Sequence, residues 1–425
     1  MKYSVQKSRF GATLLPLAGV CVCALQLSAA DWPQWRGPQR DGTSVEKGLL
    51  REWPKAGPRL LWKIKEAGSG FSTPAVVGDR IYLLGNEGVE NESVRCFSVT
   101  DGKQLWTTQL GKVGNPDQKP SYPGSRSTPT VDGDRLYALS SDGDLACLDA
   151  AKGTLRWKKS LRGDFAGKPG QWAYSESPLV DGQAVICTPG GSAATLLALN
   201  KQTGEVLWKT ALPDGDEAGY ASPVQVETGG VRQYVLVTQK GLVGVEAKTG
   251  KTLWRYAKAV SRFGANIPSP VVSGDSIYTS GAGTGGAIVK LTGKDGGVTA
   301  EQLFFEAKYP VSIGGAVKVG GYLYGTTGQA LQCIDWATGK IQWEERALGA
   351  ASICTADGLL YLHGENGEIA LVEASPEGYR EKGRFTPPEL PARANQMEKA
   401  WAYPVLANGR LYVRDTTTLW CFAVK

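Results

Sequence analysis

The stretch that decides the fold is Ala198-Leu-Asn200-Lys-Gln-Thr203-Gly204-Glu-Val-Leu-Trp208. It carries a small residue, a glycine six positions later and a tryptophan ten positions later. The same intervals recur in four further segments, from Cys96 to Trp106, Cys147 to Trp157, Gly244 to Trp254 and Cys333 to Trp343. Self-similarity at a period of about 20 to 50 residues indicates that one structural unit is used many times.

Two independent markers predict eight copies of this unit. The first is the aromatic residue: Trp62 precedes the first complete copy, and Phe305 and Phe385 replace tryptophan in two degenerate copies. The second is a proline that opens a short β-branched run, found at positions 74, 129, 178, 223, 270 and 404. Segments 314–316 and 352–353 fill the two remaining places without proline. Both markers therefore give eight units of about 46 residues.

Each unit has the signals of four short antiparallel strands. In the first unit these are segments 74–77, 80–84, 94–99 and 104–106, with tight turns at Gly78-Asp79 and Asp101-Gly102. A four-stranded sheet of this size cannot bury both faces alone, whereas several such sheets packed radially can. The sequence therefore predicts an all-β fold, an eight-bladed β-propeller of four-stranded antiparallel blades.

The two ends of the repeat region are predicted to close the ring. Residues 401–423 supply only three strands, and Leu60–Ile64 supplies the missing fourth. We therefore expect the N-terminal and C-terminal strands to pair within one blade. The predicted propeller covers residues 59–425, and residues 31–58 form an N-terminal arm.

Residues 1–30 have the pattern of a secretory signal peptide. Lys2, Lys7 and Arg9 precede an apolar run from 11 to 27, and Ser28-Ala29-Ala30 follows as a cleavage site. The run is too short for a membrane span, so we expect a periplasmic or secreted protein that starts at Asp31 and has no transmembrane segment. Segment 17–21 is close to a lipobox. Lipidation at Cys21 and association with the outer membrane stay open.

Composition excludes one class of partner. Of the formal net charge of +6, three positive charges lie in the signal peptide, which leaves +3 without any basic run. We therefore expect no binding to nucleic acid. Four of the six remaining cysteines take the small-residue position of the repeat, where they are small apolar residues. The sequence does not decide whether Cys187 and Cys354 pair.

The repeat resembles the tryptophan-docking pattern of the pyrroloquinoline-quinone (PQQ) repeat family, with segments 198–208 and 333–343 matching closely. The resemblance covers residues 60–423. The family includes eight-bladed PQQ-dependent alcohol dehydrogenases and BamB-like proteins of outer-membrane barrel assembly. It implies a PQQ-like propeller in which each indole docks on the small residue. Such a fold hosts several functions.

All long loops are predicted on one face of the propeller. If the strands alternate in direction, the tight turns share one face, and the long connections share the other. The long connections are 111–126, 161–175, 256–266 and the proline-rich segment 375–399. Binding residues concentrate in variable loops on a rigid scaffold, so we expect this face to bind.

Aromatic and polar residues precede the predicted innermost strands on this face, where they should ring the mouth of the central channel. An aromatic ring with one arginine suits a flat small ligand or an inserted segment of an envelope protein. The candidates are Phe71, Tyr122, Arg126, Trp172, Tyr174, Tyr220, Asn266, Trp401 and Tyr403.

The resemblance also implies an alternative site. PQQ dehydrogenases hold calcium with a glutamate and an asparagine, use an aspartate base and stack the quinone on a disulfide between adjacent cysteines. Glu176 and Asn266 are the weak calcium candidates here. However, no two cysteines are adjacent after residue 30, and segment 309–314 offers no acid.

The leading hypothesis is therefore a monomeric, non-catalytic binding propeller without a cofactor, resembling BamB-like proteins in fold and envelope role. The alternative is an alcohol or sugar dehydrogenase that uses PQQ with calcium.

Overall fold

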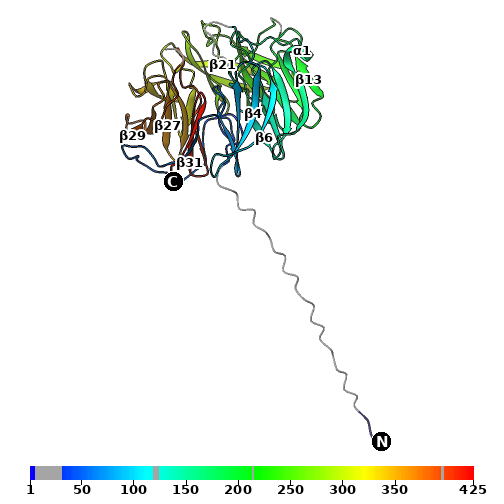
Figure 1. Ribbon diagram of the computed structural model, residues 1–425. Coiled ribbons are helices and arrows are strands. Elements are labelled where there is room, and N and C mark those ends of the chain that lie inside the picture. Colours follow the sequence, from blue (N-terminus) through cyan, green and yellow to red (C-terminus); the bar gives the residue numbers. More distant parts are fainter. Residues whose placement is uncertain (5–30, 118–123, 213–214, 394–396) are drawn as a thin grey trace.

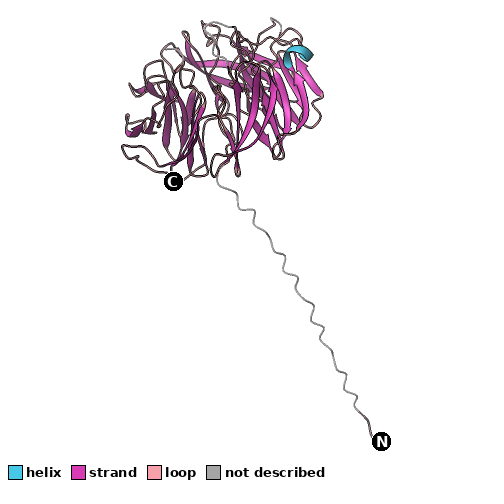
Figure 2. Ribbon diagram, in the orientation of Figure 1, coloured by secondary structure: helices cyan, strands magenta, loops and turns pink. Residues whose placement is uncertain are grey.

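The structure is a computed structural model that describes residues 1–4, 31–117, 124–212, 215–393 and 397–425. The predicted signal peptide, Cys21 and Tyr122 lie outside the described residues. Strands make up nearly all of the regular structure (Figure 2), and the described part holds one short helix, α1 (Leu161–Phe165). The helix begins at Ser160, whose hydroxyl accepts a hydrogen bond from the Gly163 N–H.

The strands form eight four-stranded antiparallel sheets, which confirms the predicted propeller. Each sheet is one blade, numbered in chain order, and its strands follow one another from the channel outward. Blade 1 contains β2 (Ala75–Val77), β3 (Arg80–Glu87), β4 (Asn91–Ser98) and β5 (Gln104–Gly111). Blade 2 contains β6 (Thr130–Asp132), β7 (Arg135–Leu139), β8 (Asp144–Asp149) and β9 (Leu155–Ser160). Blade 3 contains β10 (Leu179–Asp181), β11 (Ala184–Cys187), β12 (Leu196–Asn200) and β13 (Val206–Thr210). Blade 4 contains β14 (Val224–Thr228), β15 (Val231–Thr238), β16 (Gly241–Glu246) and β17 (Thr252–Tyr256).

The second half of the ring has the same plan. Blade 5 contains β18 (Val271–Ser273), β19 (Ser276–Gly281), β20 (Gly285–Lys294) and β21 (Gly297–Glu306). Blade 6 contains β22 (Ala316–Val319), β23 (Tyr322–Thr326), β24 (Leu331–Asp335) and β25 (Ile341–Glu345). Blade 7 contains β26 (Ala351–Ala356), β27 (Leu359–Gly364), β28 (Ile369–Glu373) and β29 (Glu381–Phe385). Blade 8 contains β30 (Val405–Ala407), β31 (Arg410–Asp415), β32 (Thr418–Ala423) and β1 (Leu60–Ile64).

Blade 8 closes the ring with both ends of the repeat region, as predicted. Strand β1 pairs antiparallel with β32, and Trp62 lies opposite Cys421. Arg414 of blade 8 stabilises the junction with blade 1, and its side chain is fully buried. It donates hydrogen bonds, each 2.8 Å long, to the carbonyl oxygen of Leu84 in blade 1 and to those of Gly68 and Ser72 in the segment before that blade.

The repeated tryptophan joins neighbouring blades. In blade 2, Trp157 lies opposite the small residue Cys147, and a β-bulge follows. Its indole Nε1 donates a hydrogen bond to the carbonyl oxygen of Lys201 in blade 3, 3.1 Å away. Gly204 lies against the ring at a φ of +74°, and a Cβ on it would come within 2.9 Å of the indole. Glycine is therefore needed there both for its conformation and for the close approach.

Two degenerate copies differ from prediction. In blade 5 the residue opposite Ile288, at the position of the docked tryptophan, is Phe304, so the assignment to Phe305 was wrong by one position. The ring of Phe304 also packs on Gly339 of blade 6. The strands of this hairpin are ten residues long, so the docked ring lies sixteen positions after Ile288 instead of ten, and the interval of the regular copies does not choose between Phe304 and Phe305.

In blade 7, Gly383 lies opposite Leu371, and Phe385 lies two residues further along β29. The loop predicted at 375–399 is therefore too long, because its residues Glu381–Phe385 form a strand. Gly383 occupies the position that tryptophan has in other blades, and a Cβ added there would come within 2.7 Å of Trp53 from the arm. The sequence of β29 is mostly polar and lacks the pattern of a strand, and in the structure the arm packs against it.

The loops separate onto two faces. The loop face carries the connections from the outer strand of one blade to the inner strand of the next, together with α1; the turn face carries the tight turns. In Figure 1, α1 lies at the top and the C-terminus at the bottom of the propeller. This arrangement places the predicted site residues that the structure describes at one end of the channel.

Residues 31–46, here called the insert, enter the channel from the turn face and return to it. Asp31 accepts a hydrogen bond from the N–H of Gly78 in the turn after β2, and Glu46 accepts one from the N–H of Gly409 in the turn after β30. Between these points the chain rises to Trp35, which lines a pocket on the loop face. The insert therefore fills the channel from the turn face as far as the pocket.

Candidate functional site

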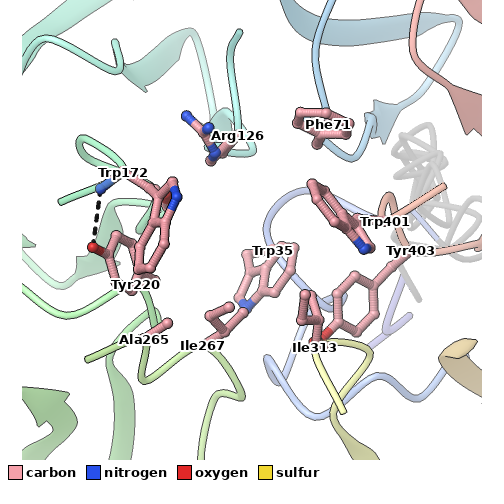
Figure 3. A pocket seen from close by; sticks show the side chains of 11 residues that line it. Trp35, Phe71, Arg126, Trp172, Tyr220, Ala265, Ile267, Ile313, Trp401 and Tyr403 are labelled. Carbon is pink, nitrogen blue, oxygen red and sulfur yellow. Dashed lines mark hydrogen bonds between the residues drawn. The ribbon is translucent and has the colours of Figure 1, made fainter. Parts of the chain in front are cut away.

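A pocket of about 280 Å³ lies at the channel mouth on the loop face (Figure 3). Seven of the connections between blades supply its walls, and the insert supplies Trp35. The lining residues are Trp35, Phe71, Arg126, Trp172, Ser175, Tyr220, Ala265, Ile267, Ile313, Trp401 and Tyr403.

The structure brings six of the nine sequence candidates together in this pocket: Phe71, Arg126, Trp172, Tyr220, Trp401 and Tyr403. Two others point elsewhere. Tyr174 is 1% exposed and donates its hydroxyl hydrogen bond to the carbonyl oxygen of Pro189, 2.7 Å away. Asn266 is fully buried behind the wall. The remaining candidate, Tyr122, is not among the described residues.

Five lining residues were missed by sequence reasoning: Trp35, Ser175, Ala265, Ile267 and Ile313. Ser175, Ala265 and Ile267 lie on connections that also carry candidates, and Ile313 lies on the connection between blades 5 and 6, which carried none; a search limited to large aromatic or charged residues passes over all four. Trp35 lies outside the repeat, and its signal is the tryptophan-rich segment Asp31–Pro38.

A chain of hydrogen bonds fixes the segments that carry the wall. The residue before the strand-opening proline supplies a hydroxyl, which accepts the backbone N–H of the equivalent residue in the preceding blade. Thr128 N–H donates to Ser177 Oγ (2.9 Å), Ser177 N–H to Ser222 Oγ (2.9 Å), Ser222 N–H to Ser269 Oγ (3.2 Å) and Tyr403 N–H to Thr73 Oγ1 (3.1 Å). Adjacent blades thus hold one another's inner edges in register.

The polar atoms of the aromatic wall mostly bond within the protein. Tyr403 donates its hydroxyl hydrogen bond to the Ile313 carbonyl oxygen (2.8 Å), and Trp401 Nε1 donates to Glu365 Oε1 (3.2 Å). The hydroxyl oxygen of Tyr220 accepts the Trp172 N–H (3.1 Å; dashed in Figure 3). The faces that remain for an occupant are therefore largely those of rings and aliphatic side chains.

Aromatic contacts hold these rings at defined angles. Phe71 and Trp401 have ring centroids 4.9 Å apart, and Trp172 and Tyr220 have centroids 5.9 Å apart at 63°. Both separations lie within the range in which tilted and edge-to-face pairs attract. The pocket is thus a preformed apolar surface.

Arg126 supplies the positive charge of the lining. Its guanidinium lies 5.9 Å from the Phe71 ring centroid, and Nη1 donates to the Gly124 carbonyl oxygen, 3.1 Å away. Burial lowers the pKa of Arg126 to about 10. This value is still well above 7, so the side chain is charged at neutral pH. Glu92 is a fully buried carboxyl that interacts electrostatically with Arg126, and burial raises its pKa to about 7.

The calcium candidates do not fit a metal site. The amide oxygen of Asn266 accepts the Ser261 N–H (2.7 Å), and its amide nitrogen donates to the Thr238 carbonyl oxygen (2.9 Å). Glu176 is 1% exposed and accepts a hydrogen bond from the Thr188 N–H. Neither residue lines the pocket, so these two side chains do not form a calcium site there.

Three further findings concern the residues in the described ranges. Among them, no group of three or more His, Cys, Asp or Glu side chains is placed to hold a metal ion. No helix there has the length and apolar composition needed to span a bilayer. Cys187 and Cys354 are both free and buried.

Comparisons with known proteins identify a family. A family model described as outer membrane protein assembly factor BamB matches residues 43–115 and 90–344. The BamB protein of Burkholderia pseudomallei is 26% identical over 328 residues, which covers 67% of this chain and 80% of that protein.

Solved structures agree on the fold. BamB from Moraxella catarrhalis superimposes with a TM-score of 0.59 at 16% identity, covering 85% of this chain and 98% of the other. A quinohemoprotein alcohol dehydrogenase from Pseudomonas putida also gives a TM-score of 0.59, at 12% identity, covering 93% of this chain and 80% of the other. The backbone alone therefore does not distinguish an assembly factor from an alcohol dehydrogenase.

Proposed function

The chain belongs to the family of the outer membrane protein assembly factor BamB, and on that premise we propose that it is a non-catalytic propeller that binds a protein partner in the cell envelope. The observation that carries this proposal is the apolar pocket at the channel mouth. The partner inserts one large apolar side chain into it, and the surrounding loops contact the adjoining segment.

Size and chemistry support this occupant. A volume of about 280 Å³ lies just below the range of about 300–1,000 Å³ typical of small-molecule sites. A single aromatic or large aliphatic side chain fits such a space, and anchors of this kind carry much of the energy of a protein interface.

Charge adds a second feature of the partner. Among the described residues that line this pocket, Arg126 is the one with a charged side chain. A carboxylate beside the inserted side chain would be attracted to it, and this pairing would direct which segments bind. The proposed ligand is thus an apolar anchor with an acidic neighbour.

The proposed location follows from the sequence. Residues 1–30 direct export and are removed, so the propeller acts in the periplasm or outside the cell, as a monomer in this proposal, and its association with the outer membrane is mediated by the partner. Cleavage before Cys21 is the alternative route, in which the chain keeps residues 21–30 and a lipid on Cys21 anchors it. The family name, which refers to outer membrane protein assembly, supports this placement.

The test is to make the pocket unable to accept an apolar side chain. Ile267→Arg places a charged group in the lining. The matched control is Phe263→Arg on the same connection, because Phe263 is 68% exposed and does not line the pocket. Each variant is produced in the native host lacking the wild-type chain, and the folded fraction of outer-membrane proteins is measured.

We expect a reduced folded fraction with Ile267→Arg and normal levels with Phe263→Arg, at equal amounts of each variant in the envelope. Full complementation by Ile267→Arg would exclude the pocket. Normal levels in cells without the chain would contradict the assembly role itself.

A further inference from the structure

The pocket is closed from beneath by a segment that is not part of any blade. The insert touches the inner strands, or the residues just before them, of blades around most of the ring. Trp32 exchanges two backbone hydrogen bonds with Val76 of blade 1 (2.7 and 2.8 Å), and Pro33 accepts the Val131 N–H of blade 2 (2.8 Å). On the return path, Ser44 N–H donates to the Thr355 carbonyl oxygen of blade 7 (2.8 Å).

Two buried arginines hold the apex of the insert. Arg40 is 3% exposed and donates to the carbonyl oxygens of Ser177 (2.9 Å) and Pro178 (3.1 Å). Arg36 is 1% exposed, donates to the Ala316 carbonyl oxygen and lies 5.5 Å from the Tyr403 ring centroid. Both guanidiniums bond to backbone carbonyl oxygens of the channel wall, so the insert is fastened to opposite sides of the ring.

Trp35 lies at this apex and faces the pocket. Its Nε1 donates to Ser269 Oγ in the hydroxyl chain (2.9 Å), and its ring meets Tyr403 edge-on, with centroids 4.7 Å apart. In Figure 3 the indole lies between the walls formed by Trp172 and Tyr220 on one side and by Trp401 and Tyr403 on the other. Because Nε1 is already hydrogen-bonded, the part of the indole that can contact an occupant is its apolar carbon surface.

We propose that Trp35 is the floor of the binding pocket and determines how long an apolar group the pocket accepts. The propeller supplies the walls, whereas the insert converts an axial channel into a cavity of limited depth. This inference rests on the proposed function only in taking this pocket as a binding site, and it deepens that function by naming a specificity-determining residue.

Coupling between the two faces follows from the same geometry. An occupant that contacts Trp35 binds tightly only while the insert is in place. By linkage, occupancy then stabilises the inserted state to the same extent. Binding at the loop face should therefore protect backbone hydrogen bonds near the turn face.

The experiment uses the purified protein from residue 31 onward and defined probes. Anilinonaphthalene sulfonate, a flat apolar molecule with one negative charge, reports occupancy by fluorescence. Straight-chain carboxylates from butanoate to decanoate then displace it, which gives affinity as a function of chain length. Each added methylene should strengthen binding about fourfold until the chain reaches the floor.

Trp35→Ala should weaken binding of the shortest carboxylates and strengthen binding of the longest. The chain length at which affinity stops rising should increase by about four carbons, because the removed indole leaves a cavity of that order. Trp35→Phe, which retains an aromatic ring, should give an intermediate limit and guards against a folding failure of the alanine variant.

The matched control is Trp32→Ala. Trp32 belongs to the same insert and is 1% exposed, but it packs near Gly37 and does not line the pocket. It should leave the chain-length limit unchanged. Equal shifts in Trp32→Ala and Trp35→Ala would overturn the assignment, because both would then reflect a loosened insert.

Amide hydrogen exchange provides the readout of coupling. Saturating decanoate should slow exchange of the Trp32 and Val76 amides in the wild type, and this protection should be lost in Trp35→Ala. An unchanged chain-length limit in Trp35→Ala, or no binding of any probe to the wild type, would refute the inference. The folded fraction of outer-membrane proteins in cells tests the proposed function separately.

Discussion

The indole Nε1 of Trp35 donates a hydrogen bond to the Oγ of Ser269, 2.9 Å away. The bond connects the apex of the insert to the segment that opens blade 5. Ser269 Oγ also accepts the Ser222 N–H, so the floor of the pocket and the seam between two blades share one hydroxyl. The site is therefore built from the same contacts that align the blades.

Trp157→Ala should lower the free energy of unfolding by about 3–5 kcal/mol. The side chain is 9% exposed, packs on Gly204 and bonds to the Lys201 carbonyl oxygen of the next blade. Leu155→Ala on the same strand removes a side chain that is 56% exposed, and should change stability by at most about 0.5 kcal/mol. Urea denaturation of both variants measures the difference; equal stabilities would refute the docking role.

Gly57→Ala should be far more destabilising than Gly78→Ala. Both glycines have positive φ, +79° and +57°, but a Cβ on Gly57 would collide with the Phe385 ring, whereas none lies near Gly78. We expect a cost of about 1–2 kcal/mol for the left-handed backbone alone, and about 1–3 kcal/mol more for overpacking at Gly57. Thermal unfolding of the pair tests this; similar melting temperatures would contradict it.

Arg414→Met should loosen the junction between blades 8 and 1. The substitution leaves the carbonyl oxygens of Ser72, Leu84 and Gly68 without this donor, and each buried unsatisfied group costs about 1–3 kcal/mol. Because removing a buried charge offsets part of this, we expect a net loss of about 3 kcal/mol. Arg414→Lys keeps the charge but not the planar fork, and should be intermediate in urea denaturation. A neutral Arg414→Met would show that blade pairing alone closes the ring.

Stability should fall as pH rises from about 4.5 to 7, in part because of Glu92. Burial raises its pKa from 4.5 to about 7, although Ser141 donates hydrogen bonds to it. In this window the folded protein retains a proton that the unfolded chain has lost, so each unit of pH costs stability until the folded pKa is reached. The full effect is on the order of 3 kcal/mol.

Glu92→Gln should remove this component and flatten the curve of unfolding free energy against pH. Glu90→Gln, at an exposed position two residues earlier, serves as the control and should reproduce the wild-type curve. A residual slope in Glu92→Gln is expected from Glu176, whose pKa burial also raises to about 7. A slope identical to that of the wild type would contradict the assignment to Glu92.

Blade number and ring closure could be predicted from sequence because they depend on local spacing. The interval between small residue, glycine and tryptophan can be read within each copy. The last unit lacks a fourth strand, which identified Leu60–Ile64 as the strand that completes it. Where spacing changed, prediction failed: the ten-residue strands of blade 5 place the docked ring, Phe304, sixteen positions after Ile288 instead of ten. In blade 7, Trp53 from the arm covers Gly383 at that position.

The pocket was predictable only in part, for a different reason. Residues just before the inner strands were expected to face the channel, and Phe71, Trp172 and Trp401 do line its mouth. Position alone does not fix orientation, however, and Tyr174 turns into the core between blades. Trp35 depends on contacts with residues more than 200 positions away, which no local pattern encodes.

The pairing of Trp62 with Cys421 has a consequence for when the molecule can become complete. Blades 1 to 7 can each assemble from one continuous segment as it emerges from the ribosome. Blade 8 must wait, because its outer strand is among the first parts of the propeller to appear, and its other three strands are the last. Until then Leu60–Ile64 has no partner, so the final closure is a late, long-range step that should set the pace of maturation.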